Sequence, residues 1–191
     1  MKIALTGWNG FLATKLREST EFEWQEELDG ADMLVHMGSP TFTQQELFEH
    51  DAQVMHQYVR ETIKLFDRFQ GPIVFASTTG VDDIKLDHTG TTSYNLGKLY
   101  LENYLMYEAD KWAILRIGTI ISRDPADVEM MKPDRIQPRI QRKDMSYIEW
   151  KDHYLFVDDF VKTTLELLRN FKTGIVEYPL TELTLPELAK L

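Results

Sequence analysis

The chain has 191 residues, 43% of them hydrophobic and 27% charged, and its 31 Asp and Glu against 21 Lys and Arg give a formal net charge of -10. This length and composition fit one globular domain with a buried core, and no apolar run is long enough to cross a membrane. The negative charge disfavours nucleic acid and anionic membranes as partners. The chain has no cysteine, which excludes disulfides, thiolate metal sites and cysteine nucleophiles. Without a signal-peptide pattern at its start, the chain is expected to be cytoplasmic.

The first thirteen residues predict a strand, a tight turn and a helix. Residues 2–6 are a short apolar run, and the helix is predicted at 11–17. Gly7 suits the turn because glycine adopts backbone angles that other residues avoid. Gly10 leaves space where a phosphate would approach, and the free N–H groups of a helix start attract an anion. The pattern is typical of a dinucleotide-binding site, with Ala13 in the third glycine position, although an ordinary strand–turn–helix is the alternative.

After this turn the chain alternates predicted strands and helices. A short second strand is predicted at 21–24, a buried strand at 31–38, a long amphipathic helix at 44–69 and a buried strand at 73–76. Apolar residues recur through the long helix with a period near that of an α-helix, and Gly71-Pro72 stops it.

The second half continues this alternation. Ser93 is the predicted cap of a helix from about Tyr94 to Ala109, a strand follows at 112–117, and residues 122–152 look irregular, with three prolines. The remaining predicted elements are a strand at 154–157, a helix capped by Asp158 or Asp159 that runs to about Asn170 and is ended by Gly174, and a short helix starting near 184–187. The pattern predicts an α/β protein with a Rossmann-like, doubly wound, mainly parallel sheet covered on both faces.

Candidate functional groups follow three of the predicted strands. They are residues 7–12, Gly38-Ser39 and Ser77-Thr78, and ligands in such sheets bind beyond the carboxyl ends of the strands. Tyr94 and Lys98 are four residues apart, so they share one helix face. An ammonium beside a phenol favours the phenolate and lowers the tyrosine pKa. The pair is therefore a proton donor and acceptor suited to near-neutral pH.

In order and spacing these segments resemble the extended short-chain dehydrogenase/reductase family, the NAD-dependent epimerases and dehydratases, along nearly the whole chain. Residues 6–13 resemble the family's T-G-x-x-G-x-x-G, 36–38 its H-L-A/G, 94–98 its Y-x-x-x-K, 115–118 its L-R-P-G and 154–159 its Y-I-H-V-D-D. Ser77-Thr78 stands where the family has its catalytic serine or threonine.

The resemblance implies roles for these residues. Tyr94 would be the acid/base, Lys98 would bind the cofactor ribose and tune Tyr94, and Thr78 would hydrogen-bond the reacting substrate oxygen, with Ser77 as the less favoured alternative. NAD or NADP would take or give the hydride. The implied cofactor-binding residues are Gly7, Asn9, Gly10, Phe11, Leu12, Met37, Gly38, Ser39 and Lys98. No metal ligands are expected, because the five scattered histidines lack ligand spacing.

The sequence also departs from the family pattern. The family has two strands between the glycine turn and the H-L-A strand, whereas residues 17–32 leave little room for them. Glu21 or Glu23 is the candidate reader of the adenosine ribose, and the lack of a basic residue there favours NAD over NADP. The family's asparagine early in the long helix has no clear counterpart around 51–57. The resemblance implies a single NAD(P)-binding domain over 1–191, with a reduced substrate lobe formed mainly by about 122–153 and 175–191.

Two classes of function remain open. The first is an NAD(P)-dependent oxidoreductase, epimerase or dehydratase acting on a carbonyl or hydroxyl of a small, sugar-like substrate, and the second is a non-catalytic dinucleotide-binding sensor. The resemblance also implies a homodimer paired through the two long helices, with the small-molecule substrate as the other partner.

Several residues have competing interpretations. Y-x-x-x-K occurs at Tyr94, Tyr107 and Tyr147, and only Tyr94 follows the strand that bears Thr78. His36 is interpreted as a packed or hydrogen-bonded residue. The basic cluster is read as a solvated loop or as an anchor for a substrate phosphate or carboxylate, and it comprises Lys132, Arg135, Arg139, Arg142 and Lys143.

Overall fold

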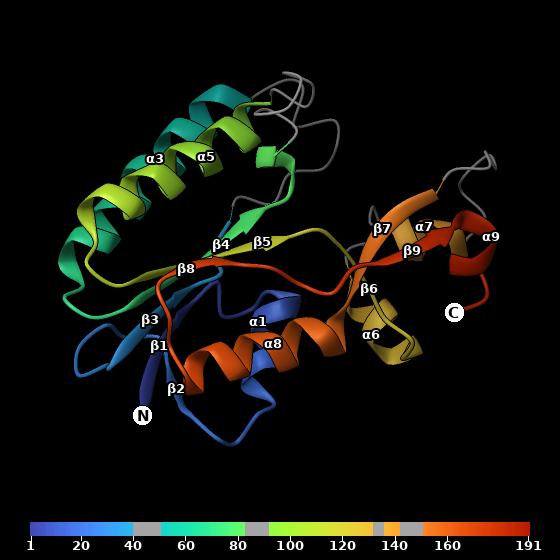
Figure 1. Cartoon of the computed structure of the whole chain (residues 1–191), viewed down its shortest axis with the longest axis horizontal. Helices are drawn as coiled ribbons and strands as arrows, with labels where there is room; N and C mark the ends of the chain where they lie inside the picture. Colours follow the sequence, from blue (N-terminus) through green and yellow to red (C-terminus); the bar gives the residue numbers. More distant parts are fainter. Residues whose placement is uncertain (40–50, 83–91, 132–135, 142–150) are drawn as a thin grey trace.

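The computed structural model describes residues 1–39, 51–82, 92–131, 136–141 and 151–191. Six parallel strands form the main sheet in the order β2-β1-β3-β4-β5-β8 (Figure 1). These strands are β1 (Lys2–Thr6), β2 (Glu23–Gln25), β3 (Met33–His36), β4 (Ile73–Thr78), β5 (Trp112–Ile117) and β8 (Gly174–Val176). Because the strand order reverses direction at β1, the switch point that binds ligands in doubly wound folds lies between β1 and β3.

Helices cover both faces of this sheet. The helices α3 (Asp51–Arg68) and α5 (Ser93–Glu108) lie side by side on one face, and α1 (Phe11–Arg17) and α8 (Val157–Arg169) lie on the other (Figure 1). Strand β1 shows why the central strands are apolar throughout. Ile3 and Leu5 pack in the core under α1 and α8, Ala4 packs in the core under α3 and α5, and all three are fully buried.

A second, smaller sheet lies beyond the carboxyl end of β5 (Figure 1). Its strands are β6 (Thr119–Ile121), β7 (Lys151–Phe156) and β9 (Thr181–Thr184), in the order β6-β7-β9. The accompanying helices are α6 (Pro125–Met130), α7 (Ile136–Gln141) and α9 (Leu185–Leu188). Tyr154 and Phe156 form a separate small core with Ile121 and Leu188. The structure thus confirms the predicted α/β class and Rossmann-like parallel sheet, to which a small second sheet is attached.

Two predictions for the second half of the chain are wrong. The stretch at 122–152 is not irregular throughout, because α6, α7 and the start of β7 fall within it. Proline is compatible with the first helical position, and the Asp124 side chain accepts the Ala126 N–H at 2.9 Å, so α6 has a proper start. Gly174 does not end the helix before it. That helix ends at Arg169, and Gly174 begins β8 instead.

Two predicted helix caps are also corrected. Thr92, not Ser93, caps α5, and its hydroxyl accepts the Asn95 N–H at 3.1 Å. The cap position of α8 is Phe156, so Asp158 and Asp159 lie in the first turn, where their charges favour the helix dipole. The long helix is described from residue 51, so its predicted start at 44–50 lies outside the described residues. None of the helices described is long and apolar enough to traverse a bilayer.

Candidate functional site

The glycine turn packs directly against the end of β3. Gly7 has φ +76°, and a Cβ atom there would lie 2.6 Å from the backbone nitrogen of Gly38. Both the backbone angle and this contact require glycine. Gly10 is the N-cap residue of α1, and its N–H donates to the Gly7 carbonyl at 2.8 Å. No side chain caps this helix start, so its first N–H groups have no side-chain acceptor, as a phosphate-binding turn requires.

The other predicted cofactor-binding residues surround this turn. Asn9 and Gly10 are exposed, whereas Phe11 and Leu12 are half-buried at the start of α1. Ala13 is buried in the core against the sheet, which confirms the predicted close packing of helix on strand. The strand pairing continues beyond β3, because the Met37 N–H donates to the Thr6 carbonyl at 3.1 Å.

Lys98 lies buried where α5 crosses β4. Its Nζ donates to the Ala76 carbonyl at 2.8 Å and to the Tyr58 hydroxyl at 3.0 Å, and the residue is 1% exposed. Burial lowers the pKa of Lys98 to about 7, and the Glu102 carboxylate opposes this shift. The Tyr94 ring lies on the same helix face, with its centroid 5.6 Å from Nζ. The predicted tyrosine–lysine neighbourhood is therefore present.

Tyr94 also contacts the segment after β3. The Ser39 Oγ donates to the Tyr94 hydroxyl at 3.4 Å, which joins two predicted site segments across 55 residues of sequence. Tyr107, by contrast, lies near the far end of α5 and is 85% exposed. Tyr147 falls outside the described residues. Among the three Y-x-x-x-K tyrosines, the structure brings Tyr94 to the carboxyl edge of the sheet.

The two candidates at the end of β4 have different surroundings. The Ser77 hydroxyl is buried and donates to Glu102 Oε1 at 2.5 Å. Thr78 is the last residue of β4 and is half-buried, and its Oγ1 accepts the Gly80 N–H at 3.3 Å. Ser77 is thus engaged in a buried network, which leaves Thr78 as the better placed hydroxyl. Contact of Thr78 with a substrate stays a prediction.

Sequence reasoning missed Tyr58, which comes from α3 and completes the surroundings of Lys98. Its hydroxyl donates to the Gly38 carbonyl at 2.8 Å and lies 3.3 Å from His36 Nε2. His36 is buried, and its Nδ1 lies 2.6 Å from the Thr6 Oγ1. Burial, together with the Lys98 charge, lowers the pKa of His36 to about 3. His36 is therefore a neutral, hydrogen-bonded core residue, as predicted.

The adenosine side of the turn is short, as the sequence predicts. Between β1 and β3 the chain forms only β2, the short strand that was expected, so the sheet ends one strand beyond β1. Neither predicted ribose reader is placed for that role. Glu23 begins β2 at the amino end of the sheet beside Lys2, and Glu21 forms an ion pair with Arg169.

The basic side chain of Arg17 lies beside the glycine turn. The Arg17 guanidinium stacks on the Trp8 ring with its Cζ 4.1 Å from the ring centroid, and its Nη2 donates to the Trp8 carbonyl at 3.0 Å. The preference for NAD over NADP stays a prediction.

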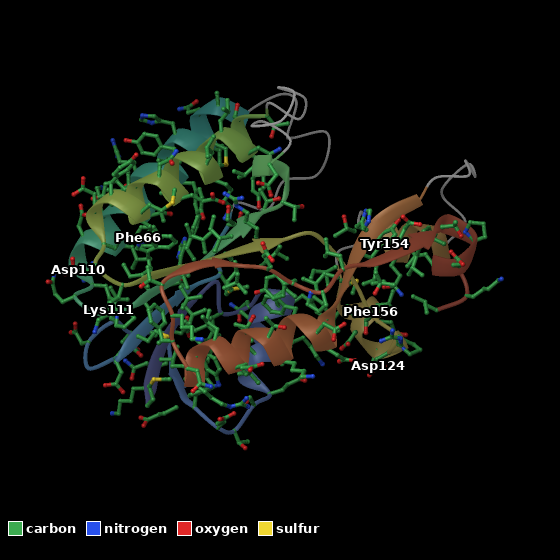
Figure 2. All side chains as sticks on the ribbon, in the orientation of Figure 1. Phe66, Asp110, Lys111, Asp124, Tyr154 and Phe156 are labelled. Atoms are coloured by element: carbon green, nitrogen blue, oxygen red, sulfur yellow. The ribbon has the colours of Figure 1, made fainter. Side chains whose placement is uncertain are left out.

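Two further features lie away from this edge. An open cavity of about 440 Å³ is found at the opposite edge of the sheet, where α3 and α5 end and β4 begins. Phe66, Asp110 and Lys111 mark its position at the far end of the helix pair (Figure 2). Neither Tyr94 nor Lys98 lines it, so it is separate from the candidate site. Of the basic cluster, residues 132–135 and 142–143 lie outside the described residues.

No protein-family model and no curated protein sequence matches this chain, whereas solved structures do. RMD from Pseudomonas aeruginosa, complexed with NADPH, matches with TM-score 0.72 and 15% identity over 100% of this chain and 82% of its own. UDP-glucuronic acid 4-epimerase from Bacillus cereus, in complex with NAD, matches with TM-score 0.69 and 14% identity, over 98% of this chain and 80% of its own. Helicobacter pylori ADP-L-glycero-D-manno-heptose-6-epimerase matches with TM-score 0.74 and 13% identity, over 98% of this chain and 79% of its own. Identities this low show a shared architecture, and the chain has the fold of the extended short-chain dehydrogenase/reductase enzymes, the NAD(P)-dependent epimerases and reductases.

Proposed function

We propose that this protein is an NAD(P)-dependent oxidoreductase, epimerase or dehydratase that acts on a carbonyl or hydroxyl of a small, sugar-like substrate. The contact between Tyr94 and Ser39 carries the proposal, because it places a phenol beside the segment that follows β3 at the switch point. A nicotinamide dinucleotide, when bound, supplies the hydride donor or acceptor. The residues present fit such a group, since the helix start at Gly10 has no side-chain cap and glycine there adds no Cβ atom.

The protein's own groups then have distinct tasks. The Tyr94 hydroxyl donates or accepts the proton at the substrate oxygen, and Thr78 hydrogen-bonds that oxygen. The Lys98 Nζ lies 5.6 Å from the centroid of the Tyr94 ring, so it can interact electrostatically with a charge that develops at the reacting groups. The second sheet and its helices receive the substrate, because they lie beyond the carboxyl end of β5.

Calorimetric titration with NAD, NADH, NADP and NADPH tests the first requirement. At least one of the four is expected to bind, and binding is expected to be lost in Gly10→Val. A panel of sugar nucleotides, followed by absorbance of the reduced cofactor or by chromatography of the sugar product, then tests turnover. Absence of binding by all four dinucleotides contradicts the proposal.

A non-catalytic dinucleotide sensor is the second candidate. The burial of Lys98 favours it, because that ammonium is enclosed by protein groups rather than facing a cleft. The two candidates differ in the effect of Tyr94→Phe. A protein that binds a dinucleotide but turns over no sugar nucleotide, in wild type as in Tyr94→Phe, is a sensor.

A further inference from the structure

We propose that Tyr58 is a positioning residue of this site, whose hydroxyl ties the Lys98 ammonium to the Gly38 carbonyl. It thereby couples α5, which carries the acid/base pair, to the segment after β3 that faces the cofactor. The functional meaning of this tie rests on the proposed function, whereas the tie itself is a property of the protein alone.

The hydrogen bonds around Tyr58 assign its donors and acceptors. A tyrosine hydroxyl has one proton, and at 2.8 Å that proton goes to the Gly38 carbonyl, which can only accept. The Lys98 Nζ at 3.0 Å must therefore donate to the Tyr58 oxygen. The same oxygen lies 3.3 Å from His36 Nε2. On its other side, His36 Nε2 lies 3.4 Å from the Thr62 Oγ1, so this nitrogen sits between two hydroxyl groups of α3.

This arrangement is more than packing, because it supports a buried charge. Lys98 has lost its water, and within the described residues the two oxygens that accept from its Nζ are those of Ala76 and Tyr58. The remaining neighbours of the ammonium are the rings of Phe75, Tyr58 and Tyr94, at 4.8, 5.0 and 5.6 Å from Nζ to the centroid. The charged group that acts on it is Glu102, one turn along α5.

The Tyr58 oxygen therefore affects both the position and the proton affinity of Lys98. A hydrogen bond to the charged form favours that form, so the oxygen opposes the effect of burial on the Lys98 pKa. Titratable groups facing the ammonium are Tyr94 and Glu102 from α5, Tyr58 from α3, and His36 from β3, which is neutral above its low pKa. Removal of the hydroxyl should lower the Lys98 pKa further and leave the Gly38 carbonyl without its partner.

The first test follows the Lys98 side chain by NMR in the protein without cofactor. Lysines labelled with ¹³C at Cε are titrated, and Lys98→Met assigns the signal. In Tyr58→Phe the Lys98 pKa is expected to fall by about half a unit or more. Tyr104→Phe is the matched control, because Tyr104 donates its hydroxyl to Asp67 across the same two helices. An unchanged Lys98 pKa in a folded Tyr58→Phe overturns the proposal. If that variant does not fold, wild type labelled with 3-fluorotyrosine, a weaker acceptor, must show the lower pKa or the proposal fails.

The second test measures coupling to the cofactor segment. Calorimetry should show NADH binding about three- to tenfold weaker in Tyr58→Phe, the loss expected for one hydrogen bond, and within about twofold of wild type in Tyr104→Phe. Equal affinity of Tyr58→Phe and wild type overturns the coupling. If wild type itself binds no dinucleotide, the proposed function fails, while the titration of Lys98 still decides the role of Tyr58.

Discussion

Arg116 and Glu102 form a two-point ion pair inside the fold. The Arg116 Nε donates to Oε1 at 3.1 Å and Nη2 donates to Oε2 at 2.6 Å, while the Glu102 side chain is fully buried. Asp82 binds the same guanidinium at 2.6 Å from its more exposed side. The pair therefore joins α5 to the end of β5. The β4 residue Ser77 donates a hydrogen bond to the same Glu102 carboxylate.

Removal of one partner of this pair should be costly. Arg116→Met leaves the Glu102 carboxylate buried and uncompensated, which is expected to lower the unfolding free energy by about 3–5 kcal/mol. The double variant with Glu102→Leu should recover much of that loss, because an apolar pair of similar volume has no charge to desolvate. Urea unfolding of both variants checks this, and additive losses in the double variant would contradict the coupling.

The two glycines of the turn should respond differently to a side chain. Gly10→Val should keep the fold, because Gly10 has φ -75° and ψ 148°, which valine adopts readily, yet the branched side chain should abolish dinucleotide binding. Gly7→Val should destabilise the fold itself, since its φ is +76° and its Cβ would overlap backbone. Circular dichroism and calorimetry separate the two effects, and a Gly10→Val protein that still binds the cofactor would refute the site.

Catalysis should depend on one tyrosine. Tyr94→Phe is expected to remove nearly all turnover and to leave cofactor affinity within about threefold, because a hydroxyl is lost and the ring remains. Tyr107→Phe, at the exposed far end of the same helix, should leave the rate unchanged. Lys98→Met should lower both turnover and affinity. Steady-state kinetics with the substrate found in the panel tests these expectations. An active Tyr94→Phe enzyme would contradict the assignment of Tyr94 as the acid/base.

Stability should fall in mild acid because of His36. Its pKa is about 3 in the folded protein and 6.5 in the unfolded chain, so the unfolded chain binds more protons between these values. The contribution of His36 to the unfolding free energy is therefore complete above pH 6.5. Below that pH the unfolding free energy falls by up to about 1.4 kcal/mol per pH unit. Urea midpoints at pH 7 and pH 5 measure this loss. This loss of stability should be smaller in His36→Gln. An equal loss in that variant would show that other groups cause it.

The exposed sides of the two long helices are expected to form a homodimer. Tyr100 on α5 is 57% exposed, and Leu96 and Tyr107 on the same helix are also exposed, as is Val54 on α3. Large apolar side chains gathered on one helix pair are typical of a protein contact surface. Light scattering at micromolar concentration should give the mass of two chains, and Tyr100→Glu should shift it toward one. A monomer mass for wild type contradicts the prediction.

Local signals allowed much of the fold to be predicted. The helix at 11–17 and the strand at 112–117 agree with the structure, because each is an apolar or helix-forming run between clear start and stop residues. The capped last helix was likewise visible, since Thr184 and Glu187 have the spacing of a capping box and exchange hydrogen bonds. In contrast, α6 was missed, because a proline was read as a sign of irregular chain.

The surroundings of the candidate site were less accessible to sequence reasoning. Tyr58 falls within the predicted amphipathic helix at 44–69, and periodicity cannot distinguish a core aromatic residue from one whose hydroxyl contacts a lysine 40 residues away. That contact depends on how α3 and α5 pack against each other. The same holds for Glu102, a buried charged residue whose partners Arg116 and Ser77 come from two strands distant in sequence.

The shared core beneath α1 and α8 has a consequence for how the chain is made. Phe160, Leu165 and Leu168 from α8 share a core cluster with Ile3 and Leu5 of β1, which the ribosome makes earlier. Until α8 has been synthesised, that face of β1 lacks the cover that α8 supplies, and Ala13 and Leu16 of α1 remain as its neighbours. A chaperone is therefore expected to bind this protein mainly while the chain is growing. A fragment ending before residue 157 should bind hydrophobic dyes that the full chain excludes.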